Sequence, residues 1–230
     1  MNDLNCWENK FKPCCYSDRL VTKLLLLNET SKSKVDVLEI KKAIYYAKKY
    51  HGSQMRQSGE PYYSHPLEVA YRVADYIFET NILITSILHD TIEDTELDKA
   101  TIDIIFSSVI ADQVEGVTRV KIDDKISAAE LIELLRKQKR HDLLLIKLLD
   151  RVHNIETIHA KSLECQDRTI LETMINFLPM AAYLSLFDIE KILDQTCFNI
   201  TSKKLHVQHN ERFLVFEENY QPLFQEVENA

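Results

Sequence analysis

The sequence predicts an all-α fold, a helical bundle followed by a C-terminal helical extension. Apolar residues recur at the three- and four-residue spacing of amphipathic helices through most of the 230 residues. Hydrophobic residues make up 45% and charged residues 28%, which is the balance of a globular chain with a real core. The chain contains only 3 glycines, which argues against dinucleotide-binding folds and Gly-rich phosphate loops.

The sequence predicts two helices, a polar loop and a third helix in the first part of the chain. A short helix is expected over residues 20–27, and a longer one starts at Val37. The longer helix should stop near His51 and Gly52, because glycine favours a left-handed helix cap. Residues 52–64 contain glycine, serine and proline and are expected to form a loop. Pro66 suits the first position of the next helix, whose expected apolar face consists of Val69, Ala70, Val73, Ala74 and Ile77.

Further helices are expected on both sides of a charged loop at residues 120–127. They cover residues 81–89, 98–116, 127–135, 141–155 and 164–197, the last as one or two helices split around Pro179. Within residues 98–116, the side chains expected to face inward are Ile102, Ile105, Phe106 and Val109. Asp142 is expected to cap the helix that begins near His141. Residues 213–216 could form a strand.

Charge and cysteine content restrict the partners of the chain. The formal net charge of −8 disfavours a general nucleic-acid binder, which must neutralise many phosphates. The 5 cysteines include no C-x-x-C pair and predict reduced thiols. The sequence shows no secretory signal and no apolar run of membrane-spanning length. We therefore expect a cytoplasmic protein without a nucleic-acid or membrane partner, and the sequence leaves its oligomeric state open.

Two histidines and two aspartates supply a mixed nitrogen and oxygen ligand set. They are His65, His89, Asp90 and Asp150, from three separate segments of the chain. Such a set suits Mn²⁺, Fe²⁺, Co²⁺ or Zn²⁺ better than Ca²⁺, and a water on the metal would become acidic enough to act as a nucleophile. Each residue alone would more often have a structural role. Their joint pattern predicts a metal site.

A pair of carboxylates follows one helical turn after the second histidine. Glu93 lies four residues after His89, and Asp94 lies four residues after Asp90, so a continuous helix would place both pairs on one face. A carboxylate at that place could orient or deprotonate the attacking water, or support a metal-binding histidine. The alternative is a solvated acidic helix end. Beside the predicted metal ligands, catalysis is the favoured interpretation.

Taken together, these motifs resemble the RelA/SpoT family, specifically its HD-type (p)ppGpp hydrolase domain. The matching stretches are HGSQMRQSGEPYYSHPLEVA, SILHDTIEDT, VEGVTRV and IKLLDRVHNIET, in the order of the family. The resemblance covers roughly residues 35–200 and implies an HD-domain helical bundle that binds one Mn²⁺. It divides the chain into an N-terminal segment (1–32), an HD hydrolase domain (33–160), a linker-like helical extension (161–200) and a C-terminal tail (201–230).

The resemblance also implies a role for each site residue. The metal ligands would be His65, His89, Asp90 and Asp150, and the catalytic pair would be Glu93 and Asp94. The segment that packs against the guanine would contain Arg56, Gln57 and Ser58, and the nucleotide would also contact Asn154 and Thr157. Two positions depart from the family pattern. Gln57 replaces the usual lysine and Glu156 replaces the usual arginine, which removes positive charge and adds negative charge near the nucleotide.

The implied activity is that of a Mn²⁺-dependent guanosine-3′,5′-bis(diphosphate) 3′-pyrophosphohydrolase, which converts ppGpp or pppGpp to GDP or GTP and pyrophosphate. The stretch TMINFLPMAAYLSLFDIEKILDQTCF resembles the linker before the synthetase domain of long family members, so we expect a hydrolase half without a synthetase. One alternative is an HD phosphohydrolase for another nucleotide, such as NADPH. The other alternative is a degenerate alarmone-binding regulatory module. The departures from the family pattern at Gln57 and Glu156 favour this alternative.

Overall fold

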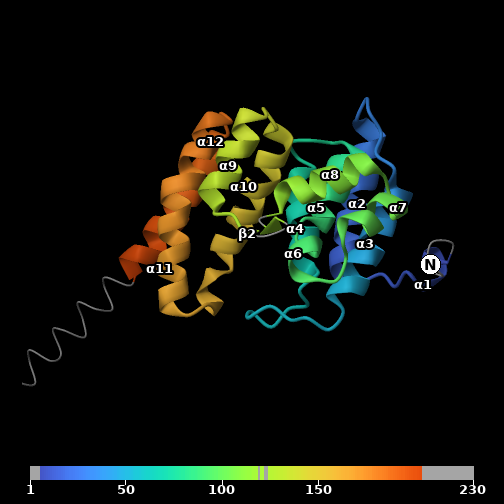
Figure 1. The fold of residues 1–230 in the computed structure, drawn as a ribbon, viewed down its shortest axis with the longest axis horizontal. Coiled ribbons are helices and arrows are strands. Elements are labelled where there is room, and N and C mark those ends of the chain that lie inside the picture. Colours follow the sequence, from blue (N-terminus) through green and yellow to red (C-terminus); the bar gives the residue numbers. More distant parts are fainter. Residues whose placement is uncertain (1–5, 119, 122–123, 204–230) are drawn as a thin grey trace, which may run out of the picture.

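The fold is all-α, as the sequence predicts (Figure 1). The computed structural model describes residues 6–118, 120–121 and 124–203. Within these residues, helices joined by short connections form the molecule, and the sheet structure consists of one antiparallel pair of two-residue strands.

The helices and strands follow one another along the chain as α1 (Trp7–Lys10), α2 (Cys15–Thr30), α3 (Val37–His51), α4 (Ser64–Val73), α5 (Thr80–Leu88), α6 (Thr91–Asp94), α7 (Lys99–Ile105), α8 (Ser108–Val117), β1 (Val120–Lys121), β2 (Asp124–Lys125), α9 (Ala128–Lys137), α10 (His141–Glu156), the 3₁₀ turn η1 (Ile158–Ala160), α11 (Leu163–Glu172), the π-helical turn η2 (Thr173–Phe177) and α12 (Leu178–Tyr183). A further helix covers residues 187–203.

Local capping explains why several helices begin and end where the sequence predicts. The side chain of Asp36 accepts two backbone N–H groups from the first turn of α3. Gly52, with a φ of 51°, ends that helix. Ser127 and Glu130 form a capping box at the start of α9. The predicted boundaries of α3, α9 and α10 are therefore confirmed to within one or two residues.

The prediction of one helix over residues 98–116 is wrong. The segment forms two helices, α7 and α8, because the Ser107 hydroxyl accepts the backbone N–H of Ile110 and starts a new helix. Val109, which was predicted to face inward, is 52% exposed as a result. The end of the segment agrees with the prediction, because α8 ends at Val117, one residue after Gly116.

Four smaller boundary predictions also differ from the structure. Helix α2 extends beyond residues 20–27 at both ends, and Pro66 is the third residue of α4 instead of the first. Residues 120–127 contain the strands β1 and β2. Asp142 does not cap α10. It lies in the first turn of that helix, where its Oδ2 is 2.7 Å from Nη2 of Arg140.

The C-terminal extension breaks after Pro179 and not around it. Helix α11 continues through η2 into α12, and Pro179 occupies the first turn of α12, where its missing N–H group is not needed. The break comes at Ser185, which has a φ of 58°. The strand suggested at residues 213–216 lies outside the described residues, and the division of the chain into four regions stays a prediction.

Helices α4, α5 and α10 form the centre of the bundle and position the site. Residues 82–88 of α5 and residues 143–153 of α10 are buried without interruption. Both helices lie in the interior because they are covered on several sides: α5 packs against α3, α4 and α8, and α10 packs against α4, α8 and α9. Side chains carried by these helices are therefore held by neighbours on several sides.

The extension packs on α10 through η2 and α12, which appear in orange beside α10 in Figure 1. The guanidinium carbon of Arg151 lies 4.1 Å from the ring centroid of Phe177, and its Nη2 lies 2.5 Å from Oε2 of Glu172. Arg151 is buried, so this contact joins the two parts firmly. Among the described helices, none combines the length and the hydropathy needed to cross a bilayer.

Candidate metal centre and its cleft

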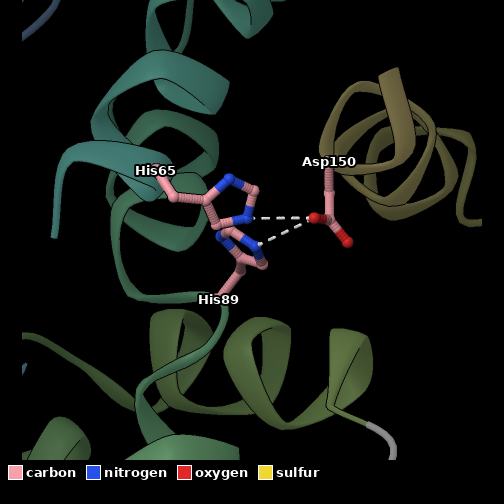
Figure 2. Close-up of side chains that lie close together, drawn as sticks. All are labelled: His65, His89 and Asp150. Carbon is pink, nitrogen blue, oxygen red and sulfur yellow. Dashed lines mark hydrogen bonds and ion pairs between the residues drawn. The ribbon is translucent and has the colours of Figure 1, made fainter. Parts of the chain in front are cut away.

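Two imidazole rings and one carboxylate meet in the interior of the bundle (Figure 2). His65 comes from α4, His89 directly follows α5, and Asp150 comes from α10. Nε2 of His65 lies 3.0 Å from Oδ1 of Asp150, and Nε2 of His89 lies 3.8 Å from the same oxygen. Figure 2 shows both rings pointing toward the carboxylate. Their ligand-type atoms all lie within 4.8 Å of one another, close enough to share one divalent ion.

Asp90 approaches the same two rings. Its Oδ1 lies 3.0 Å from Nε2 of His89, and its Oδ2 lies 3.5 Å from Nε2 of His65. His89 and Asp90 occupy the junction between α5 and α6. Successive residues within one helix would project about 100° apart, and the break between the helices lets these neighbours converge. The structure thus brings together all four residues that the sequence suggested as ligands.

Among the described residues, only one ring nitrogen of His89 has a hydrogen-bond partner. Its Nδ1 donates to the backbone carbonyl of Ser86 at 2.7 Å, so in the neutral ring Nε2 is a lone-pair acceptor. Within the described part of the chain, this buried Nε2 has no hydrogen-bond partner. Its nearest polar neighbours are carboxylate oxygens, which carry no proton to donate when ionised. A cation satisfies such a nitrogen, so the residues present fit a divalent metal.

The electrostatics of the cluster favour a cation at the same place. Burial lowers the pKa of His89, but Asp90 and Asp150 outweigh burial and raise that pKa to about 10. Burial raises the pKa of Asp90, and the nearby His89 more than reverses this and lowers it. Burial would also raise the pKa of Asp150, but Lys147, His65 and His89 outweigh burial and lower that pKa. Two ionised carboxylates in a buried site attract positive charge, which a proton on His89 or a metal can supply.

A surrounding layer of polar side chains holds the cluster in place. Nδ1 of His65 lies 2.6 Å from Nδ1 of His153, and Nδ2 of Asn154 donates to Oδ1 of Asp150 at 2.6 Å. Nζ of Lys147 lies 3.2 Å from Oδ2 of Asp150. Such contacts fix ring orientation and carboxylate position. The sequence reasoning did not single out His153 or Lys147, although both lie three residues from Asp150 on one helix.

Asp94 is held by residues that follow α3. The hydroxyl of Tyr62 donates to Oδ2 of Asp94 at 2.6 Å, and Nε2 of Gln54 donates to the backbone carbonyl of Asp94 at 2.9 Å. His51 supports both, because its Nδ1 lies 2.8 Å from Oε1 of Gln54 and its ring stacks on Tyr62 with centroids 4.7 Å apart. Burial raises the pKa of Asp94, Tyr62 opposes this, and Asp90 adds to the increase.

The continuous helix expected from His89 to Asp94 does not form. Helix α5 ends at Leu88, and Glu93 and Asp94 belong to the four-residue helix α6. The backbone N–H of Asp94 still donates to the carbonyl of Asp90 at 2.9 Å. Both Glu93 and Asp94 line the cleft above the metal cluster, as their predicted roles require.

Three of the five predicted nucleotide-binding residues lie in contact. Nη2 of Arg56 donates to Oγ1 of Thr157 at 3.0 Å and lies 3.5 Å from Oδ1 of Asn154. The loop that carries Arg56 is closed by a backbone hydrogen bond to Glu60 and by Gly59, whose φ is 90°. Gln57 and Ser58 lie at the exposed tip of this loop, away from that contact.

The negative charge of Glu156 is compensated within the structure. Arg72 of α4 forms a bidentate pair with it, with Nη1–Oε1 and Nη2–Oε2 distances of 3.2 and 2.7 Å. The residue therefore ties the end of α10 to α4 instead of presenting an uncompensated charge to the nucleotide. The other His-Asp pair, at residues 141–142, takes no part in the site. His141 is exposed and contacts the hydroxyl of Tyr183 at 3.2 Å.

A cleft of about 760 Å³ opens over the candidate metal centre. One wall carries the metal cluster and the two acidic residues of α6. The other wall comes from α11 and η2, where Cys165, Arg168, Glu172 and Ile175 follow one another at three- and four-residue spacing. The sequence predicts a linker-like helical extension for this segment. The three- and four-residue spacing of these side chains can be seen in the sequence. It does not predict which part of the bundle this face of α11 and η2 packs beside.

The chain belongs to the HD domain family, whose model matches residues 43–186. Its curated relatives identify the branch of that family. The GTP pyrophosphokinase rsh of Brucella ovis is 35% identical over 211 residues, which cover 88% of this chain and 28% of the relative. The guanosine-3′,5′-bis(diphosphate) 3′-pyrophosphohydrolase of Aquifex aeolicus is 36% identical over 163 residues, which cover 70% of this chain and 23% of the relative. The predicted resemblance to the RelA/SpoT hydrolase domain is thereby confirmed.

A solved structure supports the fold. It is described as "A metazoan ortholog of SpoT hydrolyzes ppGpp and plays a role in starvation responses", and it is 21% identical to this chain with a TM-score of 0.57. The match covers 71% of this chain and 96% of the solved one. In contrast, the chain spans only 28% and 23% of the length of the two curated relatives.

Proposed function

We propose that the chain is a guanosine-3′,5′-bis(diphosphate) 3′-pyrophosphohydrolase that uses Mn²⁺. The observation that carries this proposal is the buried Nε2 of His89, which has carboxylate oxygens nearby but no hydrogen-bond partner among the described residues, in a His/Asp cluster below a cleft. The names of the relatives supply the substrate class. A cleft of about 760 Å³ is also within the usual range for sites that take a nucleotide.

His65, His89, Asp90 and Asp150 would hold the metal. Their donors, imidazole nitrogens and carboxylate oxygens, suit Mn²⁺ as well as Fe²⁺, Co²⁺ and Zn²⁺, and the family resemblance favours Mn²⁺. When bound, the ion would polarise the 3′-phosphate and make a water molecule more acidic. Nδ1 of His89 already donates to a carbonyl, so its Nε2 is directed at the metal position without rearrangement.

The protein would move protons through the carboxylates of α6. The oxygen of water attacks the phosphorus bonded to the ribose 3′ oxygen, that phosphorus–oxygen bond breaks, and the ribose oxygen takes up a proton. The products from ppGpp are GDP and pyrophosphate. Asp94 is suited to accept the proton of the attacking water, because burial raises the pKa of this carboxyl group and Tyr62 holds it in place. Glu93 would act beside it on the same cleft.

Arg56, Asn154 and Thr157 would hold the nucleoside part of the substrate. They already form one connected group, in which the guanidinium of Arg56 bridges the loop and the end of α10. A guanidinium can stack on a base and offset phosphate charge at the same time. Gln57 and Ser58, at the tip of the same loop, would lie along the edge of the guanine.

The proposal is tested with the purified chain, ppGpp and metal. After treatment with a chelator the protein should release no pyrophosphate, and Mn²⁺ should restore the release of pyrophosphate together with GDP. NADPH and pppGpp are assayed in parallel to define the preferred nucleotide. Tight binding of ppGpp in calorimetry without turnover would reject the hydrolase and support the regulatory alternative. Turnover of NADPH but not of ppGpp would reject the guanine substrate and keep the metal chemistry.

A further inference from the structure

Helix α6 carries both proposed catalytic carboxylates, Glu93 and Asp94, and it is only four residues long. A helix of one turn is not stable by itself, because its few hydrogen bonds do not offset the cost of starting it. Among the described elements, its main packing partner is α3. The position of Asp94 above the metal cluster therefore depends on the contacts that join α6 to the end of α3.

Two hydrogen bonds make this connection, and both come from the base of the loop that follows α3. The hydroxyl of Tyr62 donates to Oδ2 of Asp94, and Nε2 of Gln54 donates to the backbone carbonyl of Asp94. The two donors are joined to each other, since the backbone N–H of Tyr62 donates to the carbonyl of Gln54 at 2.9 Å. Arg56 lies further along the same loop and reaches α10. The loop thus contacts Asp94 at its base and carries Arg56 beyond it.

His51, the last residue of α3, contacts both donors. The carbonyl of Asp94 can only accept, so Gln54 must direct its NH₂ group there and its Oε1 toward His51. Nδ1 of His51 therefore donates to that Oε1, at 2.8 Å, and fixes the orientation of the amide. The ring also stacks on Tyr62.

The burial of His51 indicates that this contact has a role. The residue is buried, and within the described part of the chain its Nε2 has no hydrogen-bond partner. Burying a polar atom without a partner has a cost that an apolar side chain of similar size would avoid. The bond from Nδ1 to Gln54 is what such an apolar side chain could not provide.

We propose that His51 is a positioning residue for hydrolysis, which holds Asp94 above the metal centre through Gln54 and Tyr62. The inference rests on the proposed function and adds to it a residue that does not line the cleft. Because Arg56 belongs to the same loop, His51 also links the place where the nucleoside would bind to the place where the proton of water would be taken up.

The test compares three substitutions of His51 in the assay of ppGpp hydrolysis with Mn²⁺. His51→Ala should lower kcat at least tenfold, the scale of one lost hydrogen bond, and should change KM and the Mn²⁺ affinity measured by calorimetry much less. His51→Asn keeps an N–H donor close to the position of Nδ1 and should recover most of the lost kcat. His51→Leu fills the buried volume without a donor and should recover little.

Two further variants separate positioning from general stability. Ile44→Ala, at another buried position of α3, should lower the melting temperature and leave kcat near the value of wild type. His51→Ala added to Asp94→Asn should have little further effect, as expected for residues that act through one group. A kcat restored by His51→Leu but not by His51→Asn overturns the proposal, because His51 would then only fill space. An equal loss of kcat in Ile44→Ala also overturns it.

Amide hydrogen exchange tests the same contact without catalysis. The backbone N–H groups of Asp94 and Thr95 donate to the carbonyls of Asp90 and Thr91 within α6. In His51→Ala, exchange over residues 91–95 should be at least tenfold faster, with α10 unchanged and with protection restored in His51→Asn. If wild type does not hydrolyse ppGpp, the proposed function fails, and this exchange still decides whether His51 holds α6. Unchanged exchange over residues 91–95 in His51→Ala rejects that role.

Discussion

Replacing Tyr62 with phenylalanine removes one hydroxyl group that binds the carboxylate of Asp94. The Tyr62 hydroxyl donates to Oδ2 of Asp94 at 2.6 Å, and the two rings of His51 and Tyr62 remain stacked after the change. A hydrogen bond to a charged group contributes about 1.5–3 kcal/mol. We take the lower end, because the pair opens onto the cleft. If the bond positions the proton acceptor, kcat should fall about tenfold, since about 1.4 kcal/mol corresponds to a factor of ten.

The same substitution has a predictable effect on pH dependence. The Tyr62 hydrogen bond lowers the pKa of Asp94, which burial raises. Removing the hydroxyl therefore raises the pKa of Asp94 further, so the carboxyl group stays protonated up to a higher pH. Because a protonated carboxyl cannot accept the proton of water, the acid limb of the kcat profile should move to higher pH.

The assay is the kcat of ppGpp hydrolysis as a function of pH, at saturating Mn²⁺. Tyr183→Phe is the control, because its hydroxyl contacts His141 at 3.2 Å and lies outside the cleft. Added to Asp94→Asn, the Tyr62→Phe change should have little further effect, as expected for two residues that act as a unit. A Tyr62→Phe protein with the kcat and the acid limb of wild type refutes the positioning role.

Three further substitutions test the rest of the site. Asp150→Asn keeps the shape of the side chain but removes an anionic donor, so Mn²⁺ affinity measured by calorimetry and turnover should both collapse, whereas His141→Ala should leave both nearly unchanged. Arg56→Ala should raise KM for ppGpp far more than it changes Mn²⁺ affinity, because its proposed partner is the nucleotide; an unchanged KM would show that Arg56 only bridges the loop to α10. Glu93→Gln should lower kcat by about 10²-fold if Glu93 takes part in proton transfer, and a wild-type kcat would assign that role to Asp94 alone.

The sequence by itself predicted most of the helices and the ligand-type side chains of the candidate centre. Gly52 and Ser127 mark helix boundaries through contacts within one turn. Helix α10 can be predicted from the spacing of its own apolar residues, without knowing which helices pack against it. The same holds for residue type, since His65 and Asp150 are ligand-type side chains wherever the chain places them. Their roles stay a prediction until a metal is measured. The errors in α7 and α8 arose because the Ser107 cap was read as the interior of a longer helix.

Only the tertiary structure decided which distant side chains meet. His65 and Asp150 are separated by 85 positions, and Arg72 and Glu156 by 84, so no local period relates them. The hydrogen bonds from Gln54 and Tyr62 to Asp94 depend on how the residues after α3 pack against α6. The placement of Lys161 and Arg168 in the cleft depends on how α11 packs. Helical periodicity fixes which face of a segment is apolar or charged. The partner of that face is set by close packing across the whole core, which short-range sequence signals do not contain.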